Sequence, residues 1–340
     1  MDFSGLQRSK RLLWFLGEGQ DLRYTPLEHG QIRLLAIRPG RSEDKVVTRL
    51  VTVPLSDSLP YEALSYTWGA WNDRGTLVID GQTVDIHAGL FNAIHALRYE
   101  NFERLIWADA ICINQRDNEE KSHQIQIMDQ IYATADNVVI YLGQVTEHSQ
   151  QGIEALRSFI DLDVTLAQPP WLYVPPPQTE KCLADILMRP WFTRIWTVQE
   201  SVLARYTTLV CGKHQVSWRG DFQTLKSIVF RFKAAAIAPH FGPDGNPSHL
   251  NWTPFLQTLE AQMRQAARRE GAMIERTQLD LAFDFRHRRS TDPRDKYFAI
   301  FSIVENDRGG TLALASDYSK DVEELHRKFV TEMQRLSETI

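Results

Sequence analysis

The sequence predicts an α/β protein with a mainly parallel central sheet flanked by helices, β-hairpin insertions and a helical C-terminal part. Three observations lead to this prediction. Apolar, strand-like runs at 105–111 and 137–143 are joined by a polar helical segment, which is the βαβ pattern of a parallel sheet. Earlier stretches alternate around turn residues, as hairpins do. Beyond about residue 219 the pattern becomes mainly helical.

Two hairpins are expected before the βαβ unit. The strand-like runs at 31–39 and 46–55 flank a polar turn that contains glycine, and they form the main part of a β-rich N-terminal extension over 1–57. A short strand follows at 62–68. Asp80-Gly81 then lies between two alternating runs, which predicts a second hairpin.

The βαβ unit is preceded by an amphipathic helix over 89–99, where Leu90, Ile94 and Leu97 share one face. A helix over 118–135 begins with acidic residues and joins the two buried strands of the unit. Parallel sheets carry functional residues in the loops at the carboxyl ends of their strands. Asp109 and Asn114 are expected at that edge.

The densest signal is RPWFTRIWTVQE at 189–200, which combines two tryptophans, two arginines and a final Gln-Glu pair. Both tryptophan and arginine are costly to order, so their clustering indicates a packed pocket or anchor. Trp196 and Glu200 lie four residues apart, the spacing of one helix face. Glu200 is therefore the first candidate for a catalytic acid. A further hairpin is predicted over 206–218.

Charge and composition exclude several functional classes. The 340 residues include 38 Lys and Arg against 43 Asp and Glu, and the resulting net charge of −5 argues against a nucleic-acid binder. The three cysteines lack metal-ligand spacing, so we expect no metal site and a reducing compartment. The apolar run at 12–17 is too short to span a membrane. We expect a soluble, cytoplasmic protein that needs no cofactor.

Three blocks, YEALSYTWG at 61–69, LIWADAICINQ at 105–115 and RPWFTRIWTVQE at 189–200, resemble in this order the fungal heterokaryon incompatibility (HET) domain. A weaker fourth element lies at 290–304. The resemblance implies a protein of non-self recognition between fungal strains, a form of fungal innate immunity that triggers regulated, programmed cell death. It also suggests a division of the chain into the extension over 1–57, a HET domain over 58–218 and a mainly helical region over 219–340.

The HET domain is similar in turn to TIR domains, whose arrangement is flavodoxin-like. Some TIR domains are hydrolases that cleave NAD between nicotinamide and ribose, and by order along the chain Glu200 matches their catalytic glutamate. NAD would be the substrate of such a site, and no bound cofactor is implied. A carboxylate against the ribose would stabilise the sugar cation that forms as nicotinamide leaves.

The remaining candidates are expected to line the same hollow and contact the nucleotide. Aromatic side chains would stack on its rings, arginines would meet the pyrophosphate, and the loop residues would bind ribose hydroxyls or hold the loop. These substrate-binding candidates are Ser65, Tyr66, Trp68, Asp109, Asn114, Arg194 and Trp196, with Arg189 as a second choice for the pyrophosphate.

Each assignment has a structural alternative. The tryptophans are frequent core residues, Arg194 could form an internal ion pair, and Glu200 could serve in a salt bridge or on a helix surface. The whole domain could also act without catalysis, as an oligomerising signalling or adaptor module. Self-association and other incompatibility or receptor proteins are the expected partners, with neither nucleic acid nor a membrane span.

Overall fold

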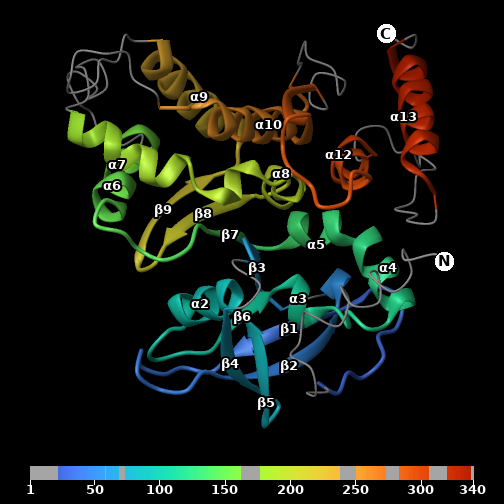
Figure 1. Ribbon diagram of the computed structural model, residues 1–340. Coiled ribbons are helices and arrows are strands. Elements are labelled where there is room, and N and C mark those ends of the chain that lie inside the picture. Colours follow the sequence, from blue (N-terminus) through green and yellow to red (C-terminus); the bar gives the residue numbers. More distant parts are fainter. Residues whose placement is uncertain are drawn as a thin grey trace, which may run out of the picture. The chain divides into compact units, whose positions relative to one another are not determined.

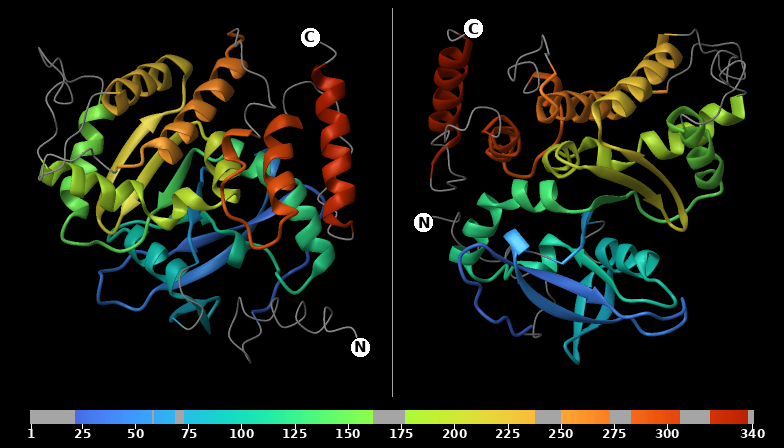
Figure 2. Two further views of the ribbon diagram at one scale, coloured as in Figure 1. Left: turned by 45° about the horizontal axis from the view of Figure 1, so that its top comes forward. Right: turned by 180° about the vertical axis from the view of Figure 1, so that it is seen from behind.

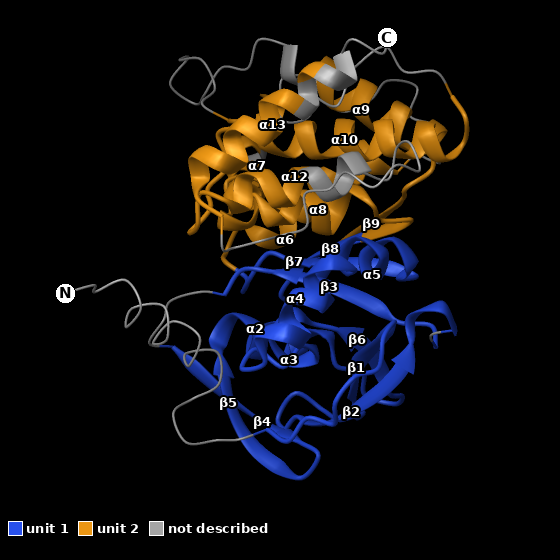
Figure 3. Ribbon diagram, turned by 90° about the vertical axis from the view of Figure 1, so that its right-hand side faces the viewer, with its two compact units in different colours: residues 1–145, 208–215 blue, residues 146–207, 216–340 orange. Residues whose placement is uncertain are grey.

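A computed structural model describes residues 22–57, 59–68, 73–161, 177–237, 250–272, 283–305 and 320–337 (Figure 1). The apolar run at 12–17 lies outside these residues. The chain forms two compact units: the first comprises 1–145 and 208–215, and the second comprises 146–207 and 216–340 (Figure 3). None of the helices in the described ranges combines the length and apolar character that crossing a membrane requires.

The strands are β1 (Gln31–Ile37), β2 (Val47–Pro54), β3 (Glu62–Tyr66), β4 (Arg74–Ile79), β5 (Gln82–His87), β6 (Arg104–Trp107), β7 (Asn137–Tyr141), β8 (Tyr206–Cys211) and β9 (His214–Arg219). They form one sheet in the order β5-β4-β2-β1-β6-β3-β7-β8-β9. The strands β1 to β7 belong to the first unit, and β8 and β9 contribute residues to both.

This sheet is mixed, which corrects the expectation of a mainly parallel one. Pairing is parallel between β2 and β4 and between β3 and each of β6 and β7, but antiparallel for β1–β2, β1–β6 and β4–β5. The cause is the N-terminal hairpin. On the side away from β2, β1 pairs with β6, and Leu35 lies opposite Ile106. The β1–β2 hairpin is therefore paired with a neighbouring strand on each side, β6 beside β1 and β4 beside β2.

Both early hairpins are confirmed. Strands β1 and β2 pair antiparallel from Gln31 opposite Pro54 to Ile37 opposite Thr48. In the β4–β5 hairpin, Asp80 and Gly81 have φ values of 49° and 78°. A two-residue turn with both φ angles positive matches the twist of the flanking strands, and only a few residue types tolerate it. The Asp-Gly pair is therefore the reason for this turn.

The βαβ unit is confirmed, but its helical part is broken. The helices of the first unit are α2 (Ala88–Leu97), α3 (Asp109–Cys112), α4 (Asn118–Gln126) and α5 (Met128–Thr134), and a 3-10 turn covers Leu55–Asp57. The predicted helix over 118–135 is interrupted at Ile127, whose ψ is 8°. Strand β6 is also shorter than expected, because α3 begins two residues after Trp107.

Different anchors explain why α4 and α5 do not form one helix. In α4, Gln124 donates a side-chain hydrogen bond to the backbone of Gln31 at the start of β1. In α5, the Tyr132 hydroxyl donates to the carbonyl of Leu64 in β3, at 3.1 Å. The two halves are thus held on different strands of the sheet. Figure 2 shows these helices from two further sides.

The second unit is built mainly from helices. These are α6 (Ser149–Ile160), α7 (Pro177–Leu187), the 3-10 helix η3 (Pro190–Thr193), α8 (Trp196–Val202), α9 (Phe222–Ile237), α10 (Thr253–Arg269), α12 (Asp295–Glu305) and α13 (Val322–Ser337). Helix α8 is central to a hydrophobic cluster that also includes residues of α10 and α12. Helix α8, which carries Glu200, therefore packs against the C-terminal helices α10 and α12 (Figure 1).

Candidate functional site

The first unit brings two candidates together at the carboxyl ends of β3 and β6. Because these strands are parallel, their last residues lie at the same edge of the sheet. Tyr66 ends β3, and its hydroxyl donates a hydrogen bond to the Asp109 carboxylate at 3.2 Å. Tyr66 is buried and Asp109 is half-buried. Tyr66 and Asp109 are therefore in contact at this edge of the sheet.

Asp109 and Asn114 both make hydrogen bonds within their own loop. The Asp109 carboxylate also accepts from the backbone N–H of Ala110 at 2.8 Å, and its carbonyl accepts from the Gln115 side chain at 2.8 Å. The Asn114 side-chain oxygen accepts from the backbone N–H of Arg116 at 3.2 Å. Through these hydrogen bonds, Asp109 and Asn114 contribute to the conformation of the loop.

Ser65 and Trp68 occupy different environments in the first block. Ser65 is fully buried in β3, opposite Ile140 of β7. Trp68 is half-buried, and its ring lies nearly parallel to that of His87, with ring centroids 6.5 Å apart. A Cβ atom at Gly89 would lie 2.7 Å from the Trp68 carbonyl oxygen, so glycine is required where α2 begins.

A buried ion pair that the motifs do not reveal braces the loop between β6 and α4. Arg33 of β1 is 1% exposed, and its guanidinium contacts both carboxylate oxygens of Glu120, at 2.6 and 2.9 Å. Arg33 also donates to the carbonyl of Cys112, and Glu120 accepts from the backbone N–H of Asn114. A charged residue in an otherwise apolar strand is the only sequence signal for this pair.

The burial of Cys112 makes its thiol unreactive at neutral pH. The side chain is fully buried in α3, and this burial raises the pKa of the thiol to about 12. The cysteine therefore stays protonated at neutral pH and is not a nucleophile. Across the described ranges, no group of three or more His, Cys, Asp or Glu side chains could hold a metal ion.

In the second unit, Glu200 lies on a helix with little contact to solvent. Glu200 is 8% exposed, and the residues from Thr197 to Val202 are all buried. Gln199 is 1% exposed, and within the described part of the chain its side-chain oxygen has no hydrogen-bond partner. Four polar residues of this seven-residue helix, Thr197, Gln199, Glu200 and Ser201, are buried.

The tryptophans of this block are packing residues to a large extent. Trp191 is 1% exposed, and its ring lies edge-on to that of Phe192. Trp196 is partly buried and packs on the hydrophobic cluster around Val198 and Phe285. Arg194 is half-buried, and its backbone forms an isolated parallel bridge with Arg289.

Arg189, the second choice for a pyrophosphate contact, is bound to a carboxylate. Its guanidinium contacts Asp185 of α7 and the Ser149 hydroxyl, each at 3.0 Å. Burial alone would raise the pKa of Asp185, but the hydrogen bonds from Ser149 and Arg189 outweigh it and lower that pKa below its ordinary value. Arg189 therefore joins α6, α7 and the start of the third block.

The candidates fall into two groups by unit. Ser65, Tyr66, Trp68, Asp109 and Asn114 belong to the first unit. Glu200, Arg194 and Trp196 belong to the second. Each group lies within one unit. The expectation that both groups line one hollow stays a prediction.

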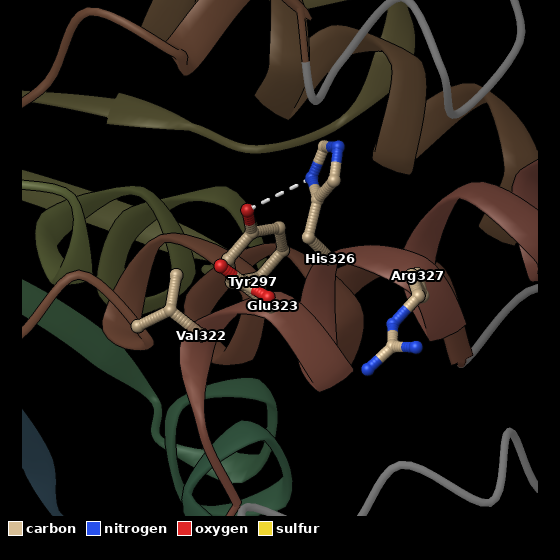
Figure 4. A pocket seen from close by; sticks show the side chains of 5 residues that line it. All are labelled: Tyr297, Val322, Glu323, His326 and Arg327. Carbon is tan, nitrogen blue, oxygen red and sulfur yellow. Dashed lines mark hydrogen bonds between the residues drawn. The ribbon is translucent and has the colours of Figure 1, made fainter.

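A separate hollow of about 440 Å³ lies between α12 and α13. Its lining residues are Tyr297, Val322, Glu323, His326 and Arg327 (Figure 4). The tyrosine hydroxyl and the histidine Nδ1 point toward one another, 3.1 Å apart. Burial raises the pKa of the tyrosine. None of the candidates from the sequence lines this hollow.

Comparison with known proteins connects these blocks to a family. Residues 61–200 match the family model described as heterokaryon incompatibility protein (HET). The chain is similar to Heterokaryon incompatibility protein 6, OR allele, of Neurospora crassa, with 30% identity over 229 residues. The match covers 55% of this chain and 34% of that protein, so this chain spans about a third of the relative's length.

No solved structure matches the chain. The family match begins at Tyr61 and ends at Glu200, so it includes the three blocks from which the resemblance was predicted. The comparisons therefore support the resemblance to HET proteins, and the matched region is residues 61–200.

Proposed function

We propose that this chain is an effector of heterokaryon incompatibility that triggers regulated cell death by cleaving NAD between nicotinamide and ribose. The family match over 61–200 and the Neurospora relative support the incompatibility function. The catalytic part of the proposal, including a TIR-like site, is inferred from the residues. Glu200, the last residue of the matched region, is its proposed catalytic carboxylate.

The observation that carries the chemistry is the burial of Glu200. A carboxylate that is only 8% exposed loses most of its hydration, which costs several kcal/mol unless the surroundings compensate. A buried ionisable group within the region that matches the family model is a candidate for a functional site. The adjacent Gln199, also buried, adds to the polar character of the same helix.

In the proposed reaction, the C–N bond between nicotinamide and ribose breaks and both its electrons stay with nicotinamide. The pyridinium becomes a neutral ring as it leaves, so no general acid is needed. The positive charge moves to the ribosyl carbon and ring oxygen, where the carboxylate of Glu200 stabilises it. Water then adds to that carbon and releases a proton, which yields ADP-ribose.

The other candidates keep the roles that their chemistry suggests. We propose that Trp68, Tyr66 or Trp196 stacks on a ring of the nucleotide and that Arg194 meets the pyrophosphate. The Tyr66–Asp109 hydrogen bond supports a role for this pair in placing a ribose or the loop beside it. Asn114 and Ser65 complete the proposed set.

Nicotinamide release from NAD by purified protein, concentrated to promote self-association, tests the proposal. Glu200→Gln removes the charge with little change in volume, and we expect it to lower turnover by about 10²- to 10³-fold. Glu154→Gln is the matched control, because Glu154 is exposed on α6 of the same unit. Thermal melting of all three proteins checks that they fold.

Full turnover in Glu200→Gln would refute the assignment of the catalytic acid. Equal cell death in fungal cells expressing wild type or Glu200→Gln, without nicotinamide release by either, would instead identify a non-catalytic signalling or adaptor module. Loss of both activities in Glu200→Gln, with Glu154→Gln at the wild-type level, would support the proposal.

A further inference from the structure

A buried cation lies against the start of α8. Arg288, in the segment before α12, is 1% exposed. Its Nη1 donates to the Thr197 hydroxyl at 3.0 Å and to the Arg194 carbonyl at 3.5 Å. Its Nη2 donates to the Thr258 hydroxyl at 2.6 Å and to the Pro254 carbonyl at 2.9 Å. One guanidinium thus contacts four oxygens from two helical segments.

All four acceptors are neutral. The guanidinium also lies over the ring of Phe285, whose centroid is 4.7 Å from the guanidinium carbon. Within the described ranges Arg288 makes no ion pair, and its Nε has no hydrogen-bond partner. Burial lowers the pKa of Arg288 to about 9, so the side chain remains charged at neutral pH. A cation buried without a counter-charge is costly, which argues for a specific role.

The acceptors belong to two separate parts of the second unit. Arg194 and Thr197 lie just before and within the first turn of α8, whereas Pro254 and Thr258 lie in the first two turns of α10. The backbone adds to this link, since Ile195 donates to the carbonyl of Arg289 at 3.0 Å. The segment around Arg288 therefore holds the beginning of α8 against α10.

Glu200 follows Thr197 by three residues, so the two lie on neighbouring positions of one helix face. A shift of the first turn of α8 moves the carboxylate with it. We propose that Arg288 is a positioning residue for Glu200, acting through Thr197 and α8. This inference rests on the proposed NAD cleavage, and it places a determinant of that site outside the region 61–200 that matches the family model.

The planar fork of arginine explains the choice of residue. Its two terminal nitrogens point to different sides, so that one reaches α8 while the other reaches α10. Lysine carries a single ammonium on a flexible chain and would satisfy one side only. Arg288→Lys should therefore retain part of the function that Arg288→Met loses.

Steady-state kinetics with NAD provides the first test. Because a displaced acid lowers the rate of chemistry more than binding, we expect Arg288→Met to lower kcat by about 10-fold or more while KM changes by less than about threefold. Arg288→Lys should lie between Arg288→Met and wild type. Arg286→Met is the matched control, since Arg286 is exposed two residues earlier in the same segment.

Hydrogen exchange provides a second test that does not depend on catalysis. Amides of residues 195–202 should exchange about 10-fold faster in Arg288→Met, with no comparable change in the first unit. Thr258→Val, which removes one acceptor on α10, should produce the same local change, whereas Thr258→Ser keeps the hydroxyl and should resemble wild type. If Arg288→Met does not fold, Arg288→Lys and Thr258→Val decide the question.

The possible outcomes separate the two proposals. Wild-type exchange of α8 in both Arg288→Met and Thr258→Val would overturn the inference, as would an unchanged kcat in Arg288→Met. Absence of nicotinamide release from wild type would refute the proposed function alone, and the exchange data would still show whether Arg288 holds α8. Equal effects of Arg286→Met and Arg288→Met would also overturn the inference.

Discussion

Arg33 in the first unit and Arg288 in the second are each 1% exposed, yet the fold compensates their charges differently. Arg33 faces both oxygens of the Glu120 carboxylate, whereas the hydrogen-bond acceptors of Arg288 are hydroxyl and carbonyl oxygens. Both hold a segment that carries a candidate residue, namely the loop after Asp109 and the helix of Glu200. The comparison shows that a guanidinium can join two elements with or without a counter-charge.

The two arrangements differ in what a substitution leaves behind. Without Arg33, a carboxylate whose side chain is 9% exposed would remain without its cation. Without Arg288, only neutral groups would remain, and these tolerate the loss better. Removing Arg33 should therefore lower the free energy of unfolding more than removing Arg288, because the group left unpaired is charged.

The largest effect is expected for Arg33→Met. It should lower the free energy of unfolding by about 3–5 kcal/mol in urea titrations, because Glu120 is left as a buried, unpaired charge. Glu103→Gln is the control: it breaks the Arg49–Glu103 pair, which is similarly short at 2.7 Å but 44% and 36% exposed. It should cost less than about 1 kcal/mol. Equal costs would show that burial does not distinguish the pairs.

A smaller effect is expected for Arg288→Met, about 1–3 kcal/mol of unfolding free energy. The variant loses hydrogen bonds to Thr197 and Thr258 but removes a buried charge at the same time. The same urea titration measures it. A cost larger than that of Arg33→Met would contradict the proposed difference between the two sites.

The smallest effect is expected at the Asp185–Arg189 pair, and it should depend on pH. The pKa of Asp185 is lowered in the folded protein, so its contribution is complete above the unfolded pKa, near 3.8, and is lost as pH falls through the folded pKa. Asp185→Asn should therefore cost about 1 kcal/mol at about pH 7 and almost nothing at about pH 2. Urea titrations across this range measure the difference, and a constant difference would contradict the expectation.

Features with local causes could be predicted from the sequence. The Asp80-Gly81 turn follows from backbone angles that few residues tolerate. The βαβ unit follows from the periodicity of its segments. The Tyr66–Asp109 contact, in contrast, depends on the parallel pairing of β3 and β6, which only the structure shows. The break at Ile127 could not be predicted, because it reflects anchors on two strands distant in the sequence.

The sequence does not show which individual charged residues are buried or what they contact. Arg286, Arg288 and Arg289 lie in one basic run, and nothing in the run distinguishes them. In the structure Arg288 is buried whereas Arg286 and Arg289 are exposed. Likewise, the sequence does not show that Arg189 contacts Asp185 and Ser149.

The sequence by itself determined the strands, the turns and the three blocks that connect the chain to the HET family, because these depend on neighbouring residues. Only the tertiary structure decided that β1 pairs with β6 and makes the sheet mixed, and that Arg33 and Arg288 are buried. The physical reason is that folding buries polar groups from distant parts of the chain together, so they must satisfy one another in place of water. Their partners then follow from the packing of whole elements and not from local pattern.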